Sequence, residues 1–158
     1  MTSPLDGTVD LLDGMAFRAT SGSGHDITLD ASPDVGGTGR GSTPMELLLL
    51  GLGGCTGMDV ISLLRKMRQQ VISYRVELHA DRAADHPKVM TAITVEHVVT
   101  GRELRPDAVR RAIELSATRY CSASAMLGAV AKITHSFQLI DAATGAEERG
   151  TLLPPHDG

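Results

Sequence analysis

The sequence has few cysteines and few aromatic residues. Among its 158 residues there are two cysteines, two phenylalanines, two tyrosines and no tryptophan. Two cysteines are too few for a disulfide scaffold or for a zinc site made of four cysteines. The shortage of aromatic side chains predicts a core that is built mainly from aliphatic residues.

The sequence also lacks an excess of basic residues and a long hydrophobic run. Its net charge of -4 offers none of the dense positive surface with which proteins bind nucleic acids. The apolar segment at 45–52 is interrupted by Glu46 and Gly51 and is too short to span a bilayer. The chain does not open on a basic-then-apolar leader. We therefore expect a cytoplasmic protein that binds neither nucleic acid nor a membrane.

The overall composition is that of a folded globular protein. Hydrophobic residues make up 42% of the chain and charged residues 22%. A chain of this length can bury a core without the help of metals or disulfides. We therefore expect a single domain over residues 1–158.

The expected secondary structure is α+β, because strands and helices do not alternate as they do in a doubly wound sheet. Along the chain we expect an N-terminal hairpin at about 8–30, a glycine-rich loop at 31–42, a long helix at about 43–69, strands at 71–81 and 89–100, helices beginning at Pro106 and after Cys121, and a strand at 133–140. The polar tail after about residue 141 is expected to fray.

The long helix has a well-defined beginning. Thr43 is a good N-cap, Pro44 is favoured at the first helical position, and Glu46 completes a capping box. Leucines at 47–50 and 52 cover every side of this helix, so it is predicted to be buried all round.

Glycines at 51, 53, 54 and 57 interrupt the same helix. Each destabilises a helix by about 1 kcal/mol relative to alanine, and helices that accept such glycines usually gain close approach by another backbone. In a chain of this size the nearest candidate is the same helix of a second copy. The glycines therefore predict a homodimer whose central helices pack together.

The two cysteines occupy different settings. Cys55 lies among the glycines of the long helix, and Cys121 lies where a short helix begins. The N–H groups of that helix and the nearby Arg119 favour a thiolate at Cys121, whereas Asp59 opposes one at Cys55. Cys121 is therefore predicted to be the more acidic thiol. Which cysteine reacts first stays open at this point.

Two segments that contain these cysteines resemble the OsmC/Ohr family, the osmotically induced and organic-hydroperoxide-resistance proteins of bacteria. They are TPMELLLLGLGGCTGMDV at 43–60 and YCSASAML at 120–127. The resemblance extends from the N-terminal hairpin to the last strand. It is strongest to the OsmC-like branch, which has a Gly-Cys-Thr-x-x-Asp-Val signature.

The resemblance implies both a fold and an activity. The fold is α+β, with antiparallel sheets wrapped around the long central helices of an intertwined homodimer and active sites at the subunit interface. The activity is that of a peroxidase, in which Cys55 attacks an organic hydroperoxide and becomes a sulfenic acid. Cys121 then forms a disulfide with Cys55, which an external dithiol such as a lipoylated protein reduces. We expect no cofactor and no metal, since the six histidines show no metal-ligand spacing.

Peroxidase members of the family also hold the attacking cysteine with an arginine and a glutamate. Here Met45 stands where the resemblance would place the glutamate, and Glu46 is its neighbour. The steps from Glu46 to Cys55 turn a straight helix by about 900°, which puts Glu46 on the opposite side and favours its capping role. For the arginine, Arg40 in the glycine-rich loop is the first candidate and Arg18 in the hairpin is the second.

Two alternatives to a peroxidase stay open. Met45 in place of glutamate, together with Asp59 near Cys55, is compatible with a redox-sensing or ligand-binding module that turns over little peroxide and holds a small apolar ligand between subunits. In the other alternative both cysteines only fill the core as small hydrophobic side chains. The distance between the two sulfur atoms bears on all three possibilities.

Overall fold

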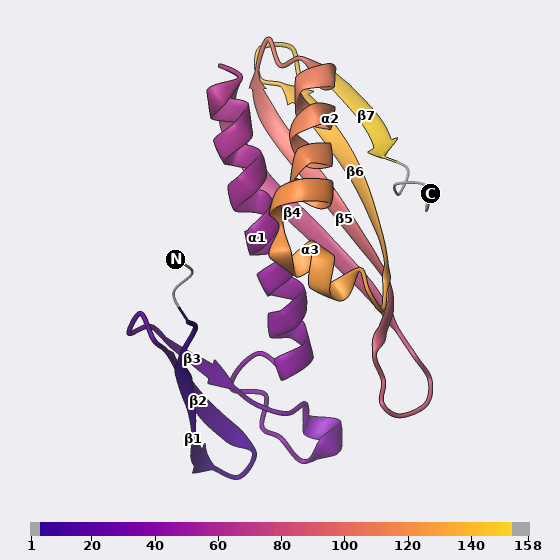
Figure 1. Cartoon of the computed structure of the whole chain (residues 1–158). Helices are drawn as coiled ribbons and strands as arrows, with labels where there is room; N and C mark the ends of the chain where they lie inside the picture. The colour runs from indigo at the N-terminus through magenta and orange to yellow at the C-terminus, as the bar shows by residue number, and fades with distance from the viewer. Residues whose placement is uncertain (1–3, 153–158) are drawn as a thin grey trace. The chain divides into compact units, whose positions relative to one another are not determined.

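The computed structural model describes residues 4–152, and they form an α+β fold, as predicted. Figure 1 shows the chain, which divides after Leu48 into two compact units, each with its own sheet. The division falls within the long helix α1 (Pro44–Lys66). A single domain over residues 1–158 stays a prediction.

The N-terminal unit contains a three-stranded antiparallel sheet in the order β1-β2-β3. Its elements are β1 (Gly7–Asp13), β2 (Ala16–Ser21), β3 (Asp26–Leu29) and a 3-10 turn η1 (Pro33–Val35). β2 and β3 form a hairpin inside the segment expected at 8–30. β1 is an additional strand, which the sequence did not reveal because every residue of it is exposed and its apolar residues do not alternate with polar ones.

Helix α1 begins with the predicted capping box. The Glu46 carboxylate accepts hydrogen bonds from the Thr43 backbone N–H at 2.7 Å and from the Thr43 hydroxyl at 3.0 Å. The Glu46 N–H in turn donates to the Thr43 hydroxyl at 3.3 Å. The hydrogen bonds from Thr43, first from its backbone and then from its side chain, lower the pKa of Glu46.

The helix ends at Lys66 rather than at about residue 69. Arg68 adopts a left-handed conformation with φ 57°, and the Gln69 N–H donates to the Leu64 carbonyl at 2.9 Å. These are the features of a Schellman motif, which usually places glycine where Arg68 stands. A non-glycine residue in this conformation gives little signal in the sequence, so the predicted end was too late.

The C-terminal unit is built on a four-stranded sheet in the order β4-β5-β6-β7. The strands are β4 (Gln70–Arg82), β5 (Met90–Arg102), β6 (Lys132–Asp141) and β7 (Glu147–Leu152). β5 and β6 are parallel, so this sheet is mixed rather than wholly antiparallel as the resemblance implied. A parallel pair needs a crossover. It consists of α2 (Pro106–Leu115), a π-helical turn η2 (Ser116–Tyr120) and α3 (Ser122–Leu127).

Strand β7 corrects the expectation of a frayed tail after residue 141. Residues 147–152 pair with β6, with Glu147 opposite Ile140 and Leu152 opposite His135. Most of β7 is polar and exposed, as expected at a sheet edge, which hid it from a search for apolar alternation. Leu152 is only 7% exposed and belongs to the core. Residues 153–158 of the predicted tail lie outside the described residues.

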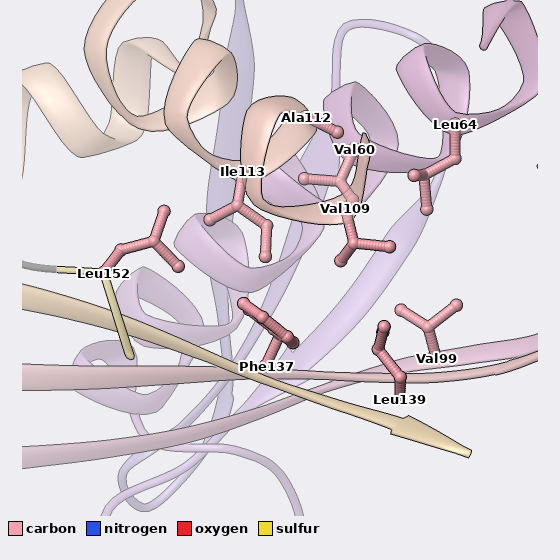
Figure 2. Close-up of a cluster of buried hydrophobic side chains, with 9 residues drawn as sticks. All are labelled: Val60, Leu64, Val99, Val109, Ala112, Ile113, Phe137, Leu139 and Leu152. Carbon is pink, nitrogen blue, oxygen red and sulfur yellow. The ribbon is translucent and has the colours of Figure 1, made fainter. Parts of the chain in front are cut away.

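The core of the C-terminal unit lies where α1 and α2 cover one face of this sheet, and Figure 2 shows the side chains that meet there. The cluster consists of Val60, Leu64, Val99, Val109, Ala112, Ile113, Phe137, Leu139 and Leu152. Apart from Phe137 all of them are aliphatic, as predicted. This packing fixes α1 beside α2, and so brings together the two segments that carry the cysteines.

The outer side of α1 is open in the described chain. Leu50 is 54% exposed and Met58 is 74% exposed, so the prediction that this helix is buried all round is wrong for the single chain. The glycines of α1 lie on both its packed side and its open side. A Cβ atom added to Gly53 would lie 2.5 Å from Leu78 Cδ1, whereas one added to Gly54 would meet nothing within 4 Å. The helix thus packs closely against β4 through Gly53 and leaves Gly54 on an apolar face.

Helix α1 is also long and apolar enough to cross a membrane by length and composition alone, with a mean hydropathy of 1.8 over its most apolar 18 residues. This corrects the expectation that the chain has no segment of sufficient length. Core helices of soluble proteins pass the same test. Since α1 contributes Val60 and Leu64 to the core, length and composition are weak evidence for a membrane span.

A hydrogen-bonded chain of three rings lies within the C-terminal unit. The Tyr74 hydroxyl lies 2.7 Å from His97 Nδ1, and His97 Nε2 lies 3.1 Å from His135 Nδ1. Burial lowers the pKa of His135 to about 4. Burial, together with the charge of His135, lowers the pKa of His97 to about 3. Both imidazoles are therefore neutral at neutral pH.

These two histidines predict that the protein loses stability in mild acid. In the unfolded chain both have a pKa near 6.5, so below that pH the unfolded state binds more protons than the folded state. Each histidine should then remove up to about 1.4 kcal/mol of unfolding free energy per pH unit as the pH falls from about 6.5 towards its folded pKa. Urea unfolding followed between pH 7.5 and 5 measures this slope.

The control compares buried with exposed histidine. A double variant, His97→Leu with His135→Leu, should have a much flatter dependence on pH, because both titrating rings are gone. His79→Gln removes an exposed histidine and should leave the slope unchanged. The same slope in wild type and the double variant would show that these histidines do not govern acid stability.

Candidate functional site

The two cysteines meet in the C-terminal unit. Cys55 lies on α1, and Cys121 is the N-cap residue of α3. Their sulfur atoms lie within 4.8 Å of each other, and both cysteines are free thiols. Cys55 is partly exposed, whereas Cys121 is only 3% exposed. The pair is thus close enough for its sulfurs to react with each other after a small movement.

A buried pair of hydroxyl groups positions the two cysteines. Thr56 Oγ1 and Ser116 Oγ lie 3.0 Å apart, and both residues are fully buried. Thr56 is the neighbour of Cys55, and the Cys121 N–H donates to the Ser116 carbonyl at 2.9 Å. Ser116 therefore connects the helix that carries one cysteine to the turn that holds the other.

The environment of Cys121 keeps it protonated. Burial, followed by the hydrogen bond with the Cys55 side chain, raises the pKa of Cys121. The Ser124 N–H donates to Cys121 Sγ at 3.3 Å and opposes this rise. The expectation that the short helix and Arg119 lower the pKa of Cys121 is therefore wrong. The six residues of α3 supply one such N–H, and the loss of solvent around the sulfur outweighs it.

Asp59 completes the group around the sulfurs. One of its carboxylate oxygens and both sulfur atoms all lie within 4.8 Å of one another. The carboxylate also accepts a hydrogen bond from Ser116 Oγ at 3.0 Å. Two sulfurs and one carboxylate oxygen form a donor set that suits zinc, and in residues 4–152 no other group of three potential metal ligands is this compact.

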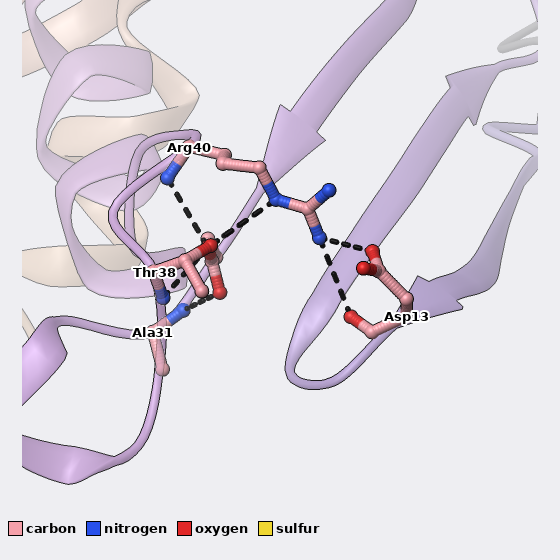
Figure 3. A network of polar contacts seen from close by, with 5 residues as sticks. Asp13, Ala31, Thr38 and Arg40 are labelled. Carbon is pink, nitrogen blue, oxygen red and sulfur yellow. Dashed lines mark hydrogen bonds and ion pairs between the residues drawn. The ribbon is translucent and has the colours of Figure 1, made fainter.

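Arg40 is held by partners in the N-terminal unit, as Figure 3 shows. Its guanidinium forms an ion pair with Asp13, and its Nε donates to Thr38 Oγ1 at 3.1 Å. Its backbone N–H donates at 3.1 Å to the buried carboxylate of Asp30. The Thr38 hydroxyl, followed by this Arg40 N–H, lowers the pKa of Asp30 to about 2. Arg40 thus stabilises the loop before α1, and its predicted role beside Cys55 stays a prediction.

The remaining candidates have local surroundings as well. Glu46 serves the capping box of α1, which confirms that part of its interpretation. Arg18 is exposed on β2, opposite Asp10 of β1. Arg119 lies over the Tyr120 ring, with its Cζ 5.6 Å from the ring centroid. A role for Glu46 or Arg18 at Cys55 stays a prediction.

The sequence reasoning missed Thr56 and Ser116. Thr56 has a weak signal, because it is a small hydroxyl residue in an apolar helix next to a cysteine. Ser116 has none, because it lies in a π-helical turn that sequence periodicity does not predict. Asp59 was noticed only as a charge opposed to a thiolate at Cys55, not as a group near both sulfurs.

Comparison with known proteins agrees with the motifs. The family model described as OsmC-like protein matches residues 37–136. Protein YhfA of Escherichia coli (strain K12) is 40% identical over 135 residues, which cover 85% of this chain and 97% of YhfA.

Solved structures have the same fold. A hypothetical protein from Aquifex aeolicus VF5 superimposes with a TM-score of 0.78 at 28% identity, over 89% of this chain and 98% of that one. The organic hydroperoxide resistance protein OsmC from Legionella pneumophila gives a TM-score of 0.67 at 13% identity, over 87% and 98% of the two chains. At that low identity the second comparison supports the fold alone.

The position of Asp59 generates a prediction about the reactivity of Cys55. Asp59→Asn removes a negative charge within 4.8 Å of the Cys55 sulfur, and its amide oxygen can still accept the Ser116 hydrogen bond. Alkylation of Cys55 by iodoacetamide at pH 7 should then be about tenfold faster, the equivalent of about 1.4 kcal/mol less charge repulsion on the thiolate. The rate is measured by mass spectrometry in a Cys121→Ser background.

A matched control separates the local charge from the net charge. Asp107→Asn changes the net charge equally at the exposed first turn of α2 and should leave the alkylation rate unchanged. Equal or slower alkylation in Asp59→Asn would show that the carboxylate does not oppose the thiolate of Cys55.

Proposed function

Since the chain belongs to the OsmC-like protein family, we propose that it is a thiol-dependent peroxidase that reduces organic hydroperoxides with Cys55 and Cys121. One observation carries the proposal. Two free thiols from distant parts of the sequence lie within 4.8 Å of each other, one partly exposed and the other buried. The choice of an organic hydroperoxide as substrate rests on the resemblance of the two cysteine segments to the OsmC/Ohr family.

In the first step, the Cys55 thiolate attacks one oxygen of the hydroperoxide. An S–O bond forms and the O–O bond breaks, so that sulfur is oxidised and the peroxide is reduced. The alkoxide takes up a proton and leaves as an alcohol, and Cys55 becomes a sulfenic acid. Its partial exposure gives Cys55 the access that this step requires, which buried Cys121 lacks.

In the second step, Cys121 attacks the sulfenic sulfur of Cys55. The S–S bond forms, the S–O bond breaks, and hydroxide leaves as water with the proton of the Cys121 thiol. Because burial raises the pKa of Cys121, this thiol needs a base when it reacts. The Asp59 carboxylate lies within 4.8 Å of both sulfurs and is our candidate for that base. An external dithiol, such as a lipoylated protein, then reduces the disulfide and is itself oxidised.

The assistance of Arg40 and Glu46 at Cys55 is part of this proposal. Both are engaged within the N-terminal unit, Arg40 with Asp13 and Glu46 with Thr43. A role at Cys55 would therefore compete with these local partners. A peroxidase assay separates assistance at Cys55 from a local structural role. Variants of Arg40 and Glu46 are compared there with a variant of Arg18.

We also propose that the protein is a homodimer. Leu50, Gly51, Gly54 and Met58 share the open face of α1, next to partly exposed Cys55. Apart from the neighbouring backbone of α1, no atom of residues 4–152 lies within 4 Å of the place where a Cβ of Gly51 or Gly54 would lie. An apolar face with glycines at its centre suits close packing against the same helix of a second copy, which would also cover Cys55.

The dimer predicts that a bulky side chain on this face separates the subunits. Gly54→Leu fits the single chain, so its circular dichroism spectrum should not change. Sedimentation equilibrium should show that the subunits associate at least about tenfold more weakly, or no longer associate, because the helices can no longer approach closely. A monomeric wild type, or a variant that dimerises as well as wild type, would contradict the dimer at this face.

The peroxidase proposal predicts different losses for the two cysteines. With cumene hydroperoxide and dithiothreitol, Cys55→Ser should consume peroxide no faster than buffer, because the attacking sulfur is gone. Cys121→Ser should react once and stop as a sulfenic acid, which dimedone labelling and mass spectrometry detect. Wild type should pass through a Cys55–Cys121 disulfide in each cycle.

The controls distinguish the proposed roles from structural ones. Arg40→Lys and Glu46→Gln should slow peroxide consumption if they assist Cys55, whereas Arg18→Lys should not. Consumption by Cys55→Ser at the wild-type rate would rule out the peroxidase. Rapid formation of one disulfide without turnover would instead support the redox-sensing function, and retention of zinc by the cysteines would explain unreactive thiols.

A further inference from the structure

A pocket of about 810 Å³ lies in the C-terminal unit beside the cysteine site. The end of α2, α3 and the loop after it, the start of β6 and Leu152 form its walls. Its volume is within the range of about 300–1,000 Å³ that small-molecule sites occupy. The proposed peroxidase reaction uses none of the side chains that line it.

Ser124 is one of the residues that line this pocket, and its hydroxyl has no hydrogen-bond partner among the described residues. Ser124 is 7% exposed, and its Oγ is the only fully buried side-chain polar atom in residues 4–152 that makes no hydrogen bond. The Ser124 backbone N–H donates its hydrogen bond to Cys121 Sγ. A buried hydroxyl without a hydrogen-bond partner is unfavourable. The unpaired Ser124 hydroxyl therefore indicates that a ligand supplies the missing partner.

His135 supplies a second polar group to the same wall. It is 6% exposed, lines the pocket, and uses its Nδ1 in the hydrogen bond with His97. The Tyr74 hydroxyl meets His97 Nδ1 and no other acceptor among the described residues, so we assign it as the donor. His97 then donates from Nε2 to His135 Nδ1, which leaves the proton of His135 on Nε2. That N–H has no partner within residues 4–152.

The charges at the rim of the pocket favour an anion. Arg111 and Glu114 form an ion pair of 3.8 Å and largely neutralise each other. Lys132 also lines the pocket and forms no ion pair with the described residues, so one positive charge remains. Between the polar groups, Val130 and Ile133 present apolar surface.

We propose that this pocket binds an amphipathic carboxylate, whose head group accepts hydrogen bonds from Ser124 Oγ and His135 Nε2 and whose hydrocarbon chain lies against Val130 and Ile133. A carboxylate satisfies both donors at once and is attracted by Lys132. A neutral alcohol of the same length lacks the charge that attracts Lys132 and accepts weaker hydrogen bonds, and an amine would meet only donors and a positive charge. The binding site is separate from the peroxidase chemistry and does not depend on it.

Titration calorimetry of the full chain with octanoate tests this proposal. We expect saturable binding of one octanoate per chain, and binding of octanol and octylamine that is at least tenfold weaker. Ser124→Ala should weaken octanoate binding by about tenfold or more, the effect of losing one hydrogen bond to a charged group. It should not lower the unfolding temperature of the ligand-free protein, because the hydroxyl that it removes has no partner.

Two further variants complete the test. Ser122→Ala changes an exposed serine two positions earlier on the same helix and should bind octanoate like wild type. Lys132→Met changes an exposed residue at the rim and should weaken octanoate but not octanol. The proposal is overturned if wild type shows no saturable octanoate binding, if octanol binds equally well, or if Ser124→Ala and Ser122→Ala bind alike.

Discussion

The buried hydrogen bond between Thr56 and Ser116 links the two halves of the candidate site. Both hydroxyl groups are fully buried, so each needs a partner, and an unpaired buried hydroxyl would cost about 1–3 kcal/mol. Ser116 also donates to Asp59 and accepts the Cys121 N–H through its carbonyl. The contact therefore holds α1, Asp59 and the cap of α3 in one arrangement, and the distance between the sulfurs follows from it.

Burial then gives the two thiols different properties. Cys121 is covered by the same packing that brings it to Cys55, and this packing raises its pKa. A buried thiol that stays protonated is a poor first nucleophile but is well placed to react with a neighbouring sulfenic acid. The Asp59 carboxylate lies within 4.8 Å of both sulfurs, and in the proposed reaction it accepts the proton of Cys121. In the proposed reaction, solvent access more than acidity therefore decides which cysteine attacks first.

Local signals in the sequence predicted much of the fold. The capping box of Thr43 and Glu46 and the proline at the start of α2 act within a few residues, and both helices begin where these signals place them. The end of α1 at Arg68 and the edge strand β7 depend on a backbone conformation and on pairing with β6, which leave little trace in the sequence. The two cysteine segments predicted the pair itself. The acidity of Cys121 was predicted wrongly, because burial by distant segments outweighs the effect of its own short helix.

The hydrogen-bond partners of the buried polar groups in the C-terminal unit cannot be predicted from their positions in the sequence. Thr56 and Ser116 satisfy each other, and His97 and His135 form a chain that ends at Tyr74. Among the described residues, Ser124 Oγ is the one fully buried side-chain polar atom that makes no hydrogen bond. Nothing in the sequence distinguishes it from the exposed Ser122 on the same helix. An unpaired hydroxyl persists in a packed structure only where something compensates for it, and the pocket that it shares with His135 is where a ligand can do so.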